Sequence, residues 1–278
     1  MTTPPVALTV AGSDSGAGAG LQADLKAMSA LGVFCATVVT AVTAQNSTGV
    51  RAVHPVPTEV VGAQLDAVLE DLPVAAVKTG MLAATPVVRL VAARAAAGDL
   101  PSLVVDPVLV ASTGRPLVDD DAVAAYRDLL LPKALVVTPN LYEAAILAGV
   151  DAGGRGDVDA MVDLARRIHG LGPAWVLVKG GHLPGVHEGT GAAGSRVADV
   201  LYDGSTATVL DQPLVTTRNN HGTGCSLASA TAALLATGLD VPGAVEGAKA
   251  FVHRALIGAA GWELGRGHGP LDPFGWQV

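Results

Sequence analysis

The sequence has little charge, few cysteines and no excess of positive side chains, and each shortage excludes a class of protein. Its two cysteines, Cys35 and Cys225, can form neither a disulfide framework nor a zinc signature. The 25 acidic residues outnumber the 17 Lys and Arg, so the net charge is -8 with His neutral. This balance argues against nucleic acid and against an anionic membrane surface as partners, because both require clustered positive charge.

Long hydrophobic runs are also lacking. The mean hydropathy is high at +0.46, but the longest apolar stretches, such as 33–44, contain Thr and are shorter than the ~18–20 residues of a spanning helix. The N-terminal residues 1–5 show neither the basic start nor the apolar middle of a signal peptide. We therefore expect a cytoplasmic protein. Hydrophobic residue types make up 50% of the 278 residues, which provides ample material for a core.

Short β-branched runs alternate with helical patterns along most of the chain. Helices are expected from Thr58, from Thr85, which precedes a proline at the first helical position, and over 157–169. Continuous apolar runs, typical of strands covered on both faces, occupy 6–11, 35–42, 75–78, 103–106, 135–138 and 175–179. This alternation predicts an α/β fold with a mainly parallel sheet and helices on both faces.

The pattern changes after residue 179. The segment 180–196 is rich in Gly and has little periodicity, so we interpret it as a mobile lid loop. An antiparallel pair of strands is expected at 197–202 and 207–210, followed by two Ala-rich helices over 222–237 and 241–260. No repeat or linker divides the sequence, which predicts one domain spanning residues 1–278.

Polar residues and glycines follow the ends of the predicted strands. In an open parallel sheet, the ligand crevice lies beyond the carboxyl ends of the strands, so these residues predict one site along that rim. The alternative is that they reflect the Gly and Asx content of turns in any α/β protein. The residues are Gly12, Ser13, Gln45, Asn46, 78–81, Asp106, Pro107, 138–140 and 179–181.

The glycine-rich segment 12–20 joins the first strand to a helix that begins near Leu21. Such a loop can bring backbone N–H groups against a ligand, because glycine tolerates positive φ; it can equally be a flexible turn. Residues 18–23 fit the G-x-G-x-x-A form of the dinucleotide fingerprint. That fingerprint needs an acidic residue after the second strand, where 43–46 has none, so an NAD-dependent oxidoreductase is disfavoured.

Two carboxylates are candidates for a metal site. Asn140 and Glu143 have the spacing of a capping box at a helix start. Alternatively, Glu143 and Asp106, which ends another strand, hold a hydrated Mg²⁺ near phosphate, since Mg²⁺ prefers a few carboxylates with waters and phosphate oxygens. The residues alone leave both interpretations open.

The segment Gly222-Thr223-Gly224-Cys225 precedes an Ala-rich helix. Consecutive amides at a helix start form an anion site and can stabilise the charge that develops on a transferred phosphate. Cys225 lies in the first turn, where the same field favours the thiolate and can lower its pKa from about 8.5. The alternative is a small buried Cys after a glycine-rich turn.

Together these segments resemble the hydroxymethylpyrimidine/phosphomethylpyrimidine kinases of thiamine biosynthesis, a branch of the ribokinase-like superfamily. The matching motifs occur in the order of the family over almost the whole chain. They are AGSDSGAGAGLQAD (11–24), TAQN (43–46), KTGM (78–81), DPV (106–108), TPNLYE (138–143), VKGGH (178–182) and GTGC (222–225).

The resemblance implies a three-layer α/β/α fold, a homodimer, and transfer of the ATP γ-phosphate with Mg²⁺. The acceptors would be the hydroxymethyl group of 4-amino-5-hydroxymethyl-2-methylpyrimidine and then its monophosphate, which becomes the diphosphate. The resemblance also implies the site residues: Gly12, Asp24, Gln45, Met81 and Val108 around the pyrimidine, Asn140 and Lys179 at ATP, Asp106 and Glu143 at Mg²⁺, and catalytic Gly222, Thr223, Gly224 and Cys225.

Cys225 stands where sugar kinases of this fold carry an Asp as catalytic base, and we expect its thiolate to accept the hydroxymethyl proton. Some vitamin B6 kinases resemble the same branch and also keep this Cys, so pyridoxal/pyridoxine kinase is the alternative function. Gln45 favours the pyrimidine, because its amide offers one donor and one acceptor to an aminopyrimidine edge. A non-catalytic pyrimidine sensor is disfavoured, since the phosphate-site residues are retained.

Overall fold

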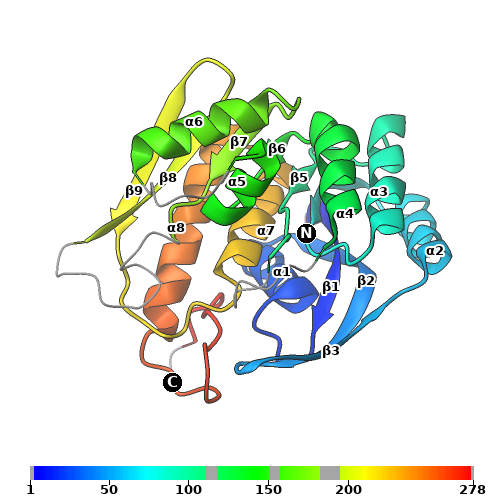
Figure 1. Cartoon of the computed structure of the whole chain (residues 1–278). Helices are drawn as coiled ribbons and strands as arrows, with labels where there is room; N and C mark the ends of the chain where they lie inside the picture. Colours follow the sequence, from blue (N-terminus) through cyan, green and yellow to red (C-terminus); the bar gives the residue numbers. More distant parts are fainter. Residues whose placement is uncertain (1–2, 111–117, 151–156, 182–194, 277–278) are drawn as a thin grey trace.

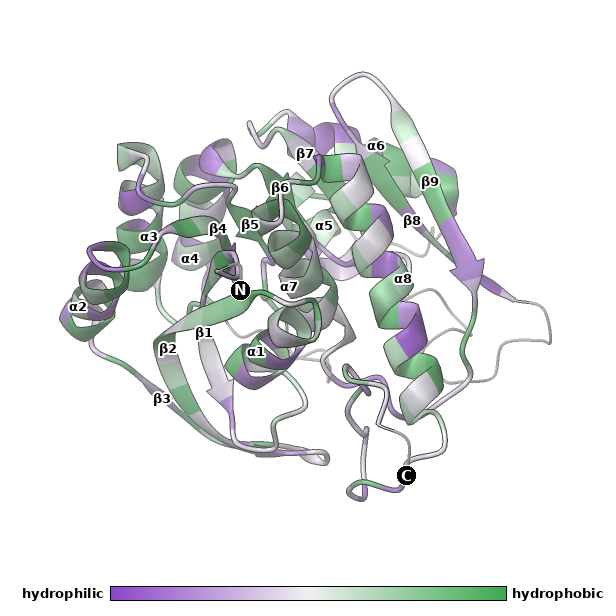
Figure 2. Cartoon of the chain, turned by 180° about the vertical axis from the view of Figure 1, so that it is seen from behind, coloured by the Kyte–Doolittle hydropathy of each residue, from purple (hydrophilic) through white to green (hydrophobic). Residues whose placement is uncertain are grey.

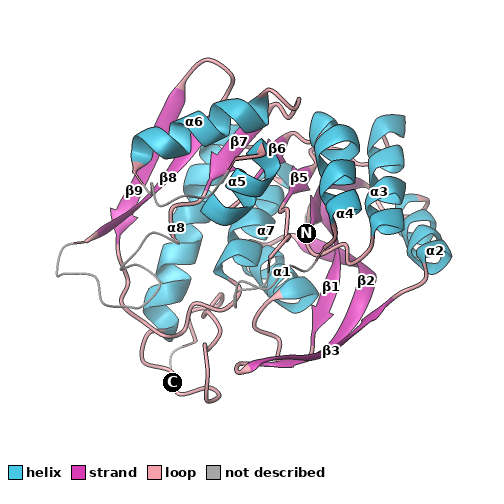
Figure 3. Cartoon of the chain, in the orientation of Figure 1, coloured by secondary structure: helices cyan, strands magenta, loops and turns pink. Residues whose placement is uncertain are grey.

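The structure, a computed structural model, describes residues 3–110, 118–150, 157–181 and 195–276, and its centre is a nine-stranded sheet (Figure 1). Figure 3 shows how helices surround this sheet. The strands are ordered β3-β2-β1-β4-β5-β6-β7-β8-β9. Their bounds are β1 Val6–Asp14, β2 Phe34–Asn46, β3 Gly49–Pro55, β4 Val74–Thr79, β5 Val104–Val105, β6 Val136–Val137, β7 Trp175–Val178, β8 Arg196–Tyr202 and β9 Ala207–Pro213.

The middle of the sheet is parallel and its edges are antiparallel. Strands β2, β1, β4, β5, β6 and β7 pair in parallel. Strand β3 pairs antiparallel with β2 at one edge, and β7, β8 and β9 pair antiparallel at the other. The mainly parallel sheet and the antiparallel pair near the C-terminus are therefore confirmed.

Helices cover both faces of the sheet (Figures 1 and 2). One face carries α1 (Gly20–Ala30), α7 (Thr223–Ala236) and α8 (Val241–Ala259). The opposite face carries α2 (Thr58–Leu69), α3 (Thr85–Ala97), α4 (Asp120–Ala125), α5 (Leu141–Ala148) and α6 (Val158–His169). A π-helical turn, Tyr126–Leu130, and a 3-10 turn, Leu131–Lys133, follow α4. The three-layer arrangement is confirmed.

Two apolar clusters lie on opposite faces of the sheet. Successive residues of a strand enter opposite clusters: Ala76 packs with the cluster under α1, α7 and α8, whereas Val77 packs with the cluster under α2 to α6. Val104 and Val105 divide in the same way. Because side chains alternate along a strand, burial on both faces requires an apolar residue at every position. This explains the continuous apolar runs in the sequence.

The first two strands extend further than predicted, which corrects the position of several candidate residues. Strand β2 continues to Asn46 because its end pairs with β3, which the sequence did not reveal. Strand β1 continues to Asp14, which pairs with Thr43. Gly12 and Gln45 therefore lie within the last residues of strands rather than after them.

Most of the predicted lid lies outside the described residues, namely 182–194. Its last residue, Arg196, was assigned to the loop incorrectly, since it begins strand β8. Within the described part of the chain, none of the helices combines the length and apolar character that crossing a membrane requires.

Candidate active site

Two glycine-rich segments from opposite ends of the chain pack directly against each other. A Cβ atom added to Gly222 would lie 1.9 Å from the carbonyl oxygen of Gly18, and one added to Gly18 would lie 2.4 Å from Cδ2 of His221. Gly222 also has a φ of +85°, which L side chains rarely adopt. Glycine at both positions therefore allows the loop between β1 and α1 to contact the loop before α7.

The carboxylate of Asp14 organises the first loop. It accepts hydrogen bonds from the backbone N–H groups of Gly16 at 2.8 Å, Gly18 at 3.0 Å and Ala19 at 2.9 Å. Burial raises the pKa of Asp14, but the hydrogen bonds from His221 and from these N–H groups outweigh burial and leave the pKa below its ordinary value. These three amides of the loop therefore bind Asp14 rather than a ligand in this structure.

The second loop keeps free donors. Gly222 is the N-cap of α7, and Thr223 donates its hydroxyl to the carbonyl oxygen of Asn220 at 2.6 Å. Among the described residues, the backbone N–H groups of Gly224 and Cys225 have no acceptor. Free N–H groups at the positive end of a helix dipole form an anion site.

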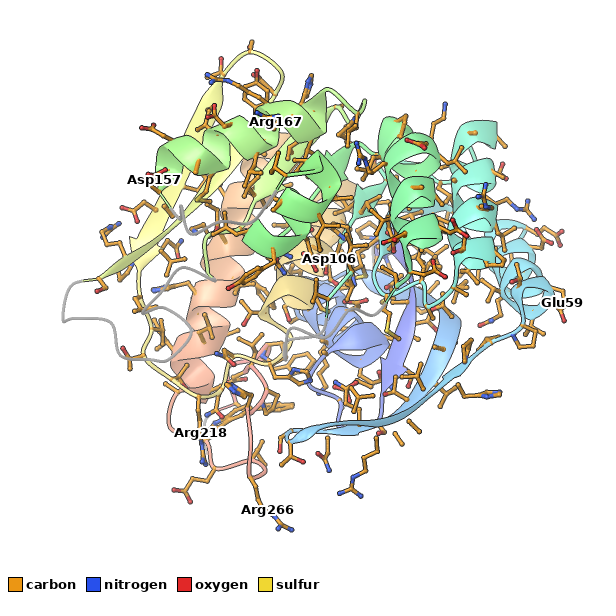
Figure 4. All side chains as sticks on the ribbon, in the orientation of Figure 1. Glu59, Asp106, Asp157, Arg167, Arg218 and Arg266 are labelled. Atoms are coloured by element: carbon orange, nitrogen blue, oxygen red, sulfur yellow. The ribbon has the colours of Figure 1, made fainter. Side chains whose placement is uncertain are left out.

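A buried ion pair lies beside this anion site. Nζ of Lys179 is 2.9 Å from Oδ1 of Asp106, and a Cβ atom added to Gly224 would lie 3.1 Å from the same Nζ. Burial lowers the pKa of Lys179, but the charges of Asp106 and Glu143 together outweigh burial. The pKa therefore lies above its ordinary value, and the ammonium stays charged. In Figure 4, Asp106 lies in the interior of the view, whereas Arg167, Arg218 and Arg266 lie at its periphery.

Glu143 caps its own helix. Its Oε2 accepts from the backbone N–H of Asn140 at 2.8 Å, and Oδ1 of Asn140 accepts from the N–H of Glu143 at 3.0 Å. The capping-box interpretation is confirmed. Burial, together with the charge of Asp106, raises the pKa of Glu143 to about 7, although Lys179 lowers it. In the described part of the chain, no group of three or more His, Cys, Asp or Glu could hold a metal ion.

Comparison with known proteins agrees with this geometry. A family model described as phosphomethylpyrimidine kinase matches residues 14–272. The chain belongs to the phosphomethylpyrimidine kinase family. As a member of this family, it is a phosphotransferase.

Relatives of the family span nearly the whole chain. A hydroxymethylpyrimidine/phosphomethylpyrimidine kinase of Rhizobium meliloti is 48% identical over 97% of this chain and 97% of its own. The corresponding kinase of Streptomyces coelicolor is 48% identical, over 99% of this chain and 96% of its own.

Solved structures confirm the ribokinase-like fold. Pyridoxal kinase of Staphylococcus aureus in complex with ADP has a TM-score of 0.86 at 35% identity and covers 99% of this chain and 95% of that protein. Phosphomethylpyrimidine kinase of Clostridium difficile has a TM-score of 0.77 at 34% identity, and the match covers 91% of this chain and 99% of that protein.

Two of the residues expected around the pyrimidine, Gly12 and Met81, lie together at the glycine-rich loop. A Cβ atom added to Gly12 would lie 2.5 Å from Cε of Met81, so these two residues are in direct contact. Met81, Gln45 and Val108 are half-buried and so present part of their side chains to solvent.

Asp24 is an exception. It is fully buried, and its carboxylate accepts hydrogen bonds from Thr9 at 2.6 Å, from Lys78 at 2.8 Å and from Ser229 at 2.5 Å. No oxygen remains exposed, so the expected contact between Asp24 and a ligand is wrong for this structure. Asp24 instead joins α1 to β1, β4 and α7. Lys78 was expected at the ligand rim with 79–81, but it is buried and pairs with Asp24 instead.

Cys225 differs from expectation in the direction of its pKa. Burial raises the pKa of the thiol to about 11, although Lys78 lowers it. The field at the start of α7 does not compensate for the loss of solvation, so the thiol is neutral at pH 7 and the predicted thiolate is wrong. A neutral thiol cannot accept the hydroxymethyl proton.

This protonation state makes Cys225 slow to alkylate. At pH 7.5, a thiol with a pKa near 11 carries roughly 300-fold less thiolate than one near 8.5. We expect iodoacetamide to label Cys225 at least ~10-fold more slowly in the folded protein than in urea, as measured by mass spectrometry of the Cys225 peptide. Equal rates in the two states would contradict the raised pKa.

We also expect the substitution Cys225→Ser to lower kcat by less than the ~10²–10⁴-fold that loss of a general base costs.

Sequence reasoning gave no role to His221 or to the C-terminal segment. Nε2 of His221 is 3.2 Å from Oδ2 of Asp14, and its backbone N–H donates to the carbonyl oxygen of Gly269 at 3.0 Å. The backbone N–H of His268 donates to the carbonyl oxygen of Ser47, between β2 and β3, at 3.1 Å. The C-terminal segment therefore joins the β2–β3 turn to the loop before α7, contacts that sequence spacing does not reveal.

Proposed function

We propose that this enzyme transfers the γ-phosphate of ATP to 4-amino-5-hydroxymethyl-2-methylpyrimidine, and then to its monophosphate, in thiamine biosynthesis. The observation that carries the proposal is the ammonium of Lys179 beside the free N–H groups of Gly224 and Cys225. The half-buried amide of Gln45 supports an aminopyrimidine as acceptor. The names of the curated relatives agree with both steps.

In the proposed reaction, the loop before α7 and Lys179 receive the charge of the transferred phosphoryl group. A phosphoryl transition state is loose, so positioning and charge neutralisation contribute most of the catalysis and little is required of a base. This is consistent with a neutral Cys225. As the bond from the acceptor oxygen to the γ-phosphorus forms, the bond from that phosphorus to the bridging oxygen breaks and ADP leaves. The hydroxyl proton is lost late, to an oxygen of the transferred phosphoryl group.

Mg²⁺ fits the carboxylates of this site. Asp106 and Glu143 are both buried, and the charge of Asp106 raises the pKa of Glu143, so a cation nearby would stabilise the ionised pair. Each carboxylate already binds the protein: Asp106 binds Lys179, and Glu143 accepts from the backbone N–H groups of Asn140 and Leu109. Two carboxylates completed by waters and phosphate oxygens are a typical Mg²⁺ environment. When bound, Mg²⁺ would neutralise charge on the phosphates of ATP.

The single-domain organisation, the cytoplasmic location and the homodimer remain predictions from the sequence.

Pyridoxal kinase is the second candidate function, because the pyridoxal kinase of Staphylococcus aureus superposes closely on this chain. A coupled assay of ATP consumption with hydroxymethylpyrimidine, its monophosphate and pyridoxine separates the candidates. We expect turnover with both pyrimidines and at least ~10-fold lower kcat/KM with pyridoxine, since its ring lacks the amino group that pairs with Gln45. Turnover with pyridoxine alone would reject the proposed function.

A further inference from the structure

The side-chain amide of Gln45 lies between two polar side chains at the mouth of the site. As placed, Nε2 of Gln45 is 3.2 Å from Nε2 of His221, and Oε1 of Gln45 is 3.4 Å from Oγ1 of Thr43. The oxygen and nitrogen ends of an amide are nearly equal in shape, so their hydrogen-bonding neighbours decide which end faces which side.

The neighbours of His221 determine where its proton lies. Nε2 of His221 is also 3.2 Å from Oδ2 of Asp14. Asp14 is ionised, because the hydrogen bonds it accepts keep its pKa below the ordinary value, so it can only accept. Nε2 of His221 must therefore carry a hydrogen. The amide end that faces His221 must be an acceptor, the oxygen Oε1.

Thr43 leads independently to the same orientation. Its hydroxyl donates to the carbonyl oxygen of Ser13 at 2.8 Å, which uses its single hydrogen. Towards Gln45, the hydroxyl can therefore only accept. The amide end that faces Thr43 must be a donor, the NH₂ group. Both neighbours then agree on one amide orientation, with Oε1 towards His221 and the NH₂ group towards Thr43, so the two ends are exchanged relative to their placement above.

We propose that His221 and Asp14 fix the polarity of the Gln45 amide, and with it the orientation in which an aminopyrimidine ring binds. In this arrangement His221 is a positioning residue and Gln45 is the group that touches the ligand. One lone pair of Oε1 and one hydrogen of the NH₂ group remain free for the ring.

The free atoms match an aminopyrimidine in one direction. This step rests on the proposed function. The ring carries an endocyclic nitrogen, the 4-amino group and the 5-hydroxymethyl group on consecutive atoms of one edge. If Oε1 accepts from the amino group and the NH₂ group donates to the endocyclic nitrogen, the hydroxymethyl group lies on the His221 side. His221 immediately precedes Gly222, so this direction turns the reacting hydroxyl towards the loop that binds phosphate. The reversed amide would turn it away.

The tautomer of His221 tests the protein part of the proposal without any ligand. Long-range ¹H–¹⁵N correlation of the histidine rings at pH 9, where an ordinary imidazole is neutral, is expected to show His221 protonated on Nε2. The His221→Gln variant assigns the signal by its loss. Protonation on Nδ1 with a bare Nε2 would overturn the proposal.

Binding of two ligands tests the substrate part. Calorimetry without ATP compares the aminopyrimidine alcohol with its analogue that lacks the 4-amino group. In the wild type, loss of the amino group is expected to weaken binding about 10-fold or more, since it leaves Oε1 unpaired. In His221→Leu, where the amide can turn freely, the same change is expected to cost less than about threefold.

Two further variants separate positioning from a structural defect. His221→Gln places an amide donor near the position of Nε2 and is expected to restore the discrimination. His268→Leu is the matched control, because Nδ1 of His268 is 2.9 Å from Oδ1 of Asn220 in the same loop but makes no contact with Gln45. Thr43→Val removes the second neighbour and is expected to relax discrimination if His221→Leu does not fold.

Equal discrimination in the wild type, His221→Leu and Thr43→Val would overturn the proposal. Equal loss of discrimination in His268→Leu would do so as well, because the effect would then belong to the loop as a whole. A wild type that binds pyridoxine but not the aminopyrimidine would reject the proposed function instead. The tautomer measurement would then still decide whether His221 sets the amide.

Discussion

Lys179→Met is expected to lower kcat by about 10²–10³, the usual loss when one donor to a developing negative charge is removed. The reason is that Nζ of Lys179 lies next to Gly224, where the proposed phosphate would bind. The variant also leaves Asp106 buried without its cation, which is expected to cost about 3–5 kcal/mol of unfolding free energy. Steady-state kinetics and chemical denaturation of the same preparation separate the two effects.

Lys249→Met is the matched control for Lys179→Met. Lys249 forms an equally buried ion pair with Asp199 at 2.5 Å; its side chain is 10% exposed, against 11% for Lys179. Its removal is expected to destabilise the fold to a similar extent but to change kcat less than about 10-fold, since the hydrogen bonds of Lys249 among the described residues go to Val197 and Asp199 and not to the loop before α7. Equal losses of kcat in both variants would show that Lys179 acts through stability alone.

Gly222→Ala is expected to lower kcat by at least about 100-fold, because displacement of a positioning loop by 1 Å has an effect of this size. The added Cβ would lie 1.9 Å from the carbonyl oxygen of Gly18, so the loop before α7 must move away from the loop after β1. The positive φ of Gly222 adds about 1–2 kcal/mol of strain. Kinetics with saturating ATP and acceptor measure the loss.

Gly238→Ala is the control that isolates the backbone strain. Gly238 also has a positive φ, +94°, but nothing lies within 4 Å of an added Cβ. It is expected to lose about 1–2 kcal/mol of unfolding free energy and to keep kcat within about twofold, because it lies far along the chain from the phosphate loop. Similar kcat values for the two variants would contradict the role of close loop contact.

The sheet and its layers were predictable because they follow from local pattern. Apolar runs such as 75–78 and 103–106 contain residues that enter both cores, as Ala76 and Val77 do. Asp106 and Lys179 were placed correctly after the ends of two parallel strands, β5 and β7, which lie on either side of β6, since strand direction alone brings them to one edge. The alternating architecture therefore predicted the fold class and the edge at which both residues lie, but not the ion pair between them.

Strand β3 was not predictable from the same pattern. Its side chains are mostly exposed, with Val50 46% and Val53 44% exposed, so no buried face marks it in the sequence. The antiparallel pairing with β2 extends the latter through Gln45. A strand at the edge of a sheet is specified by backbone pairing more than by burial, and sequence periodicity reports burial.

The roles of Asp14, Asp24 and Cys225 depended on contacts between distant parts of the chain. Asp24 is buried through Ser229, which is 205 positions away, and Asp14 contacts His221, which is 207 positions away. A motif can identify such residues as important, but it does not show whether a carboxylate faces a ligand or the interior. Burial likewise raises the pKa of Cys225, and this effect is larger than the lowering expected from the field at the start of α7.

A crystal structure with a non-hydrolysable ATP analogue and the aminopyrimidine alcohol tests the central claim most directly. The terminal phosphate is expected within hydrogen-bonding distance, about 3 Å, of the N–H groups of Gly224 and Cys225 and of Nζ of Lys179. The acceptor hydroxyl is expected to face the same phosphorus, with the ring against Gln45. A terminal phosphate out of reach of all three donors would contradict the assignment of this loop as the site of transfer.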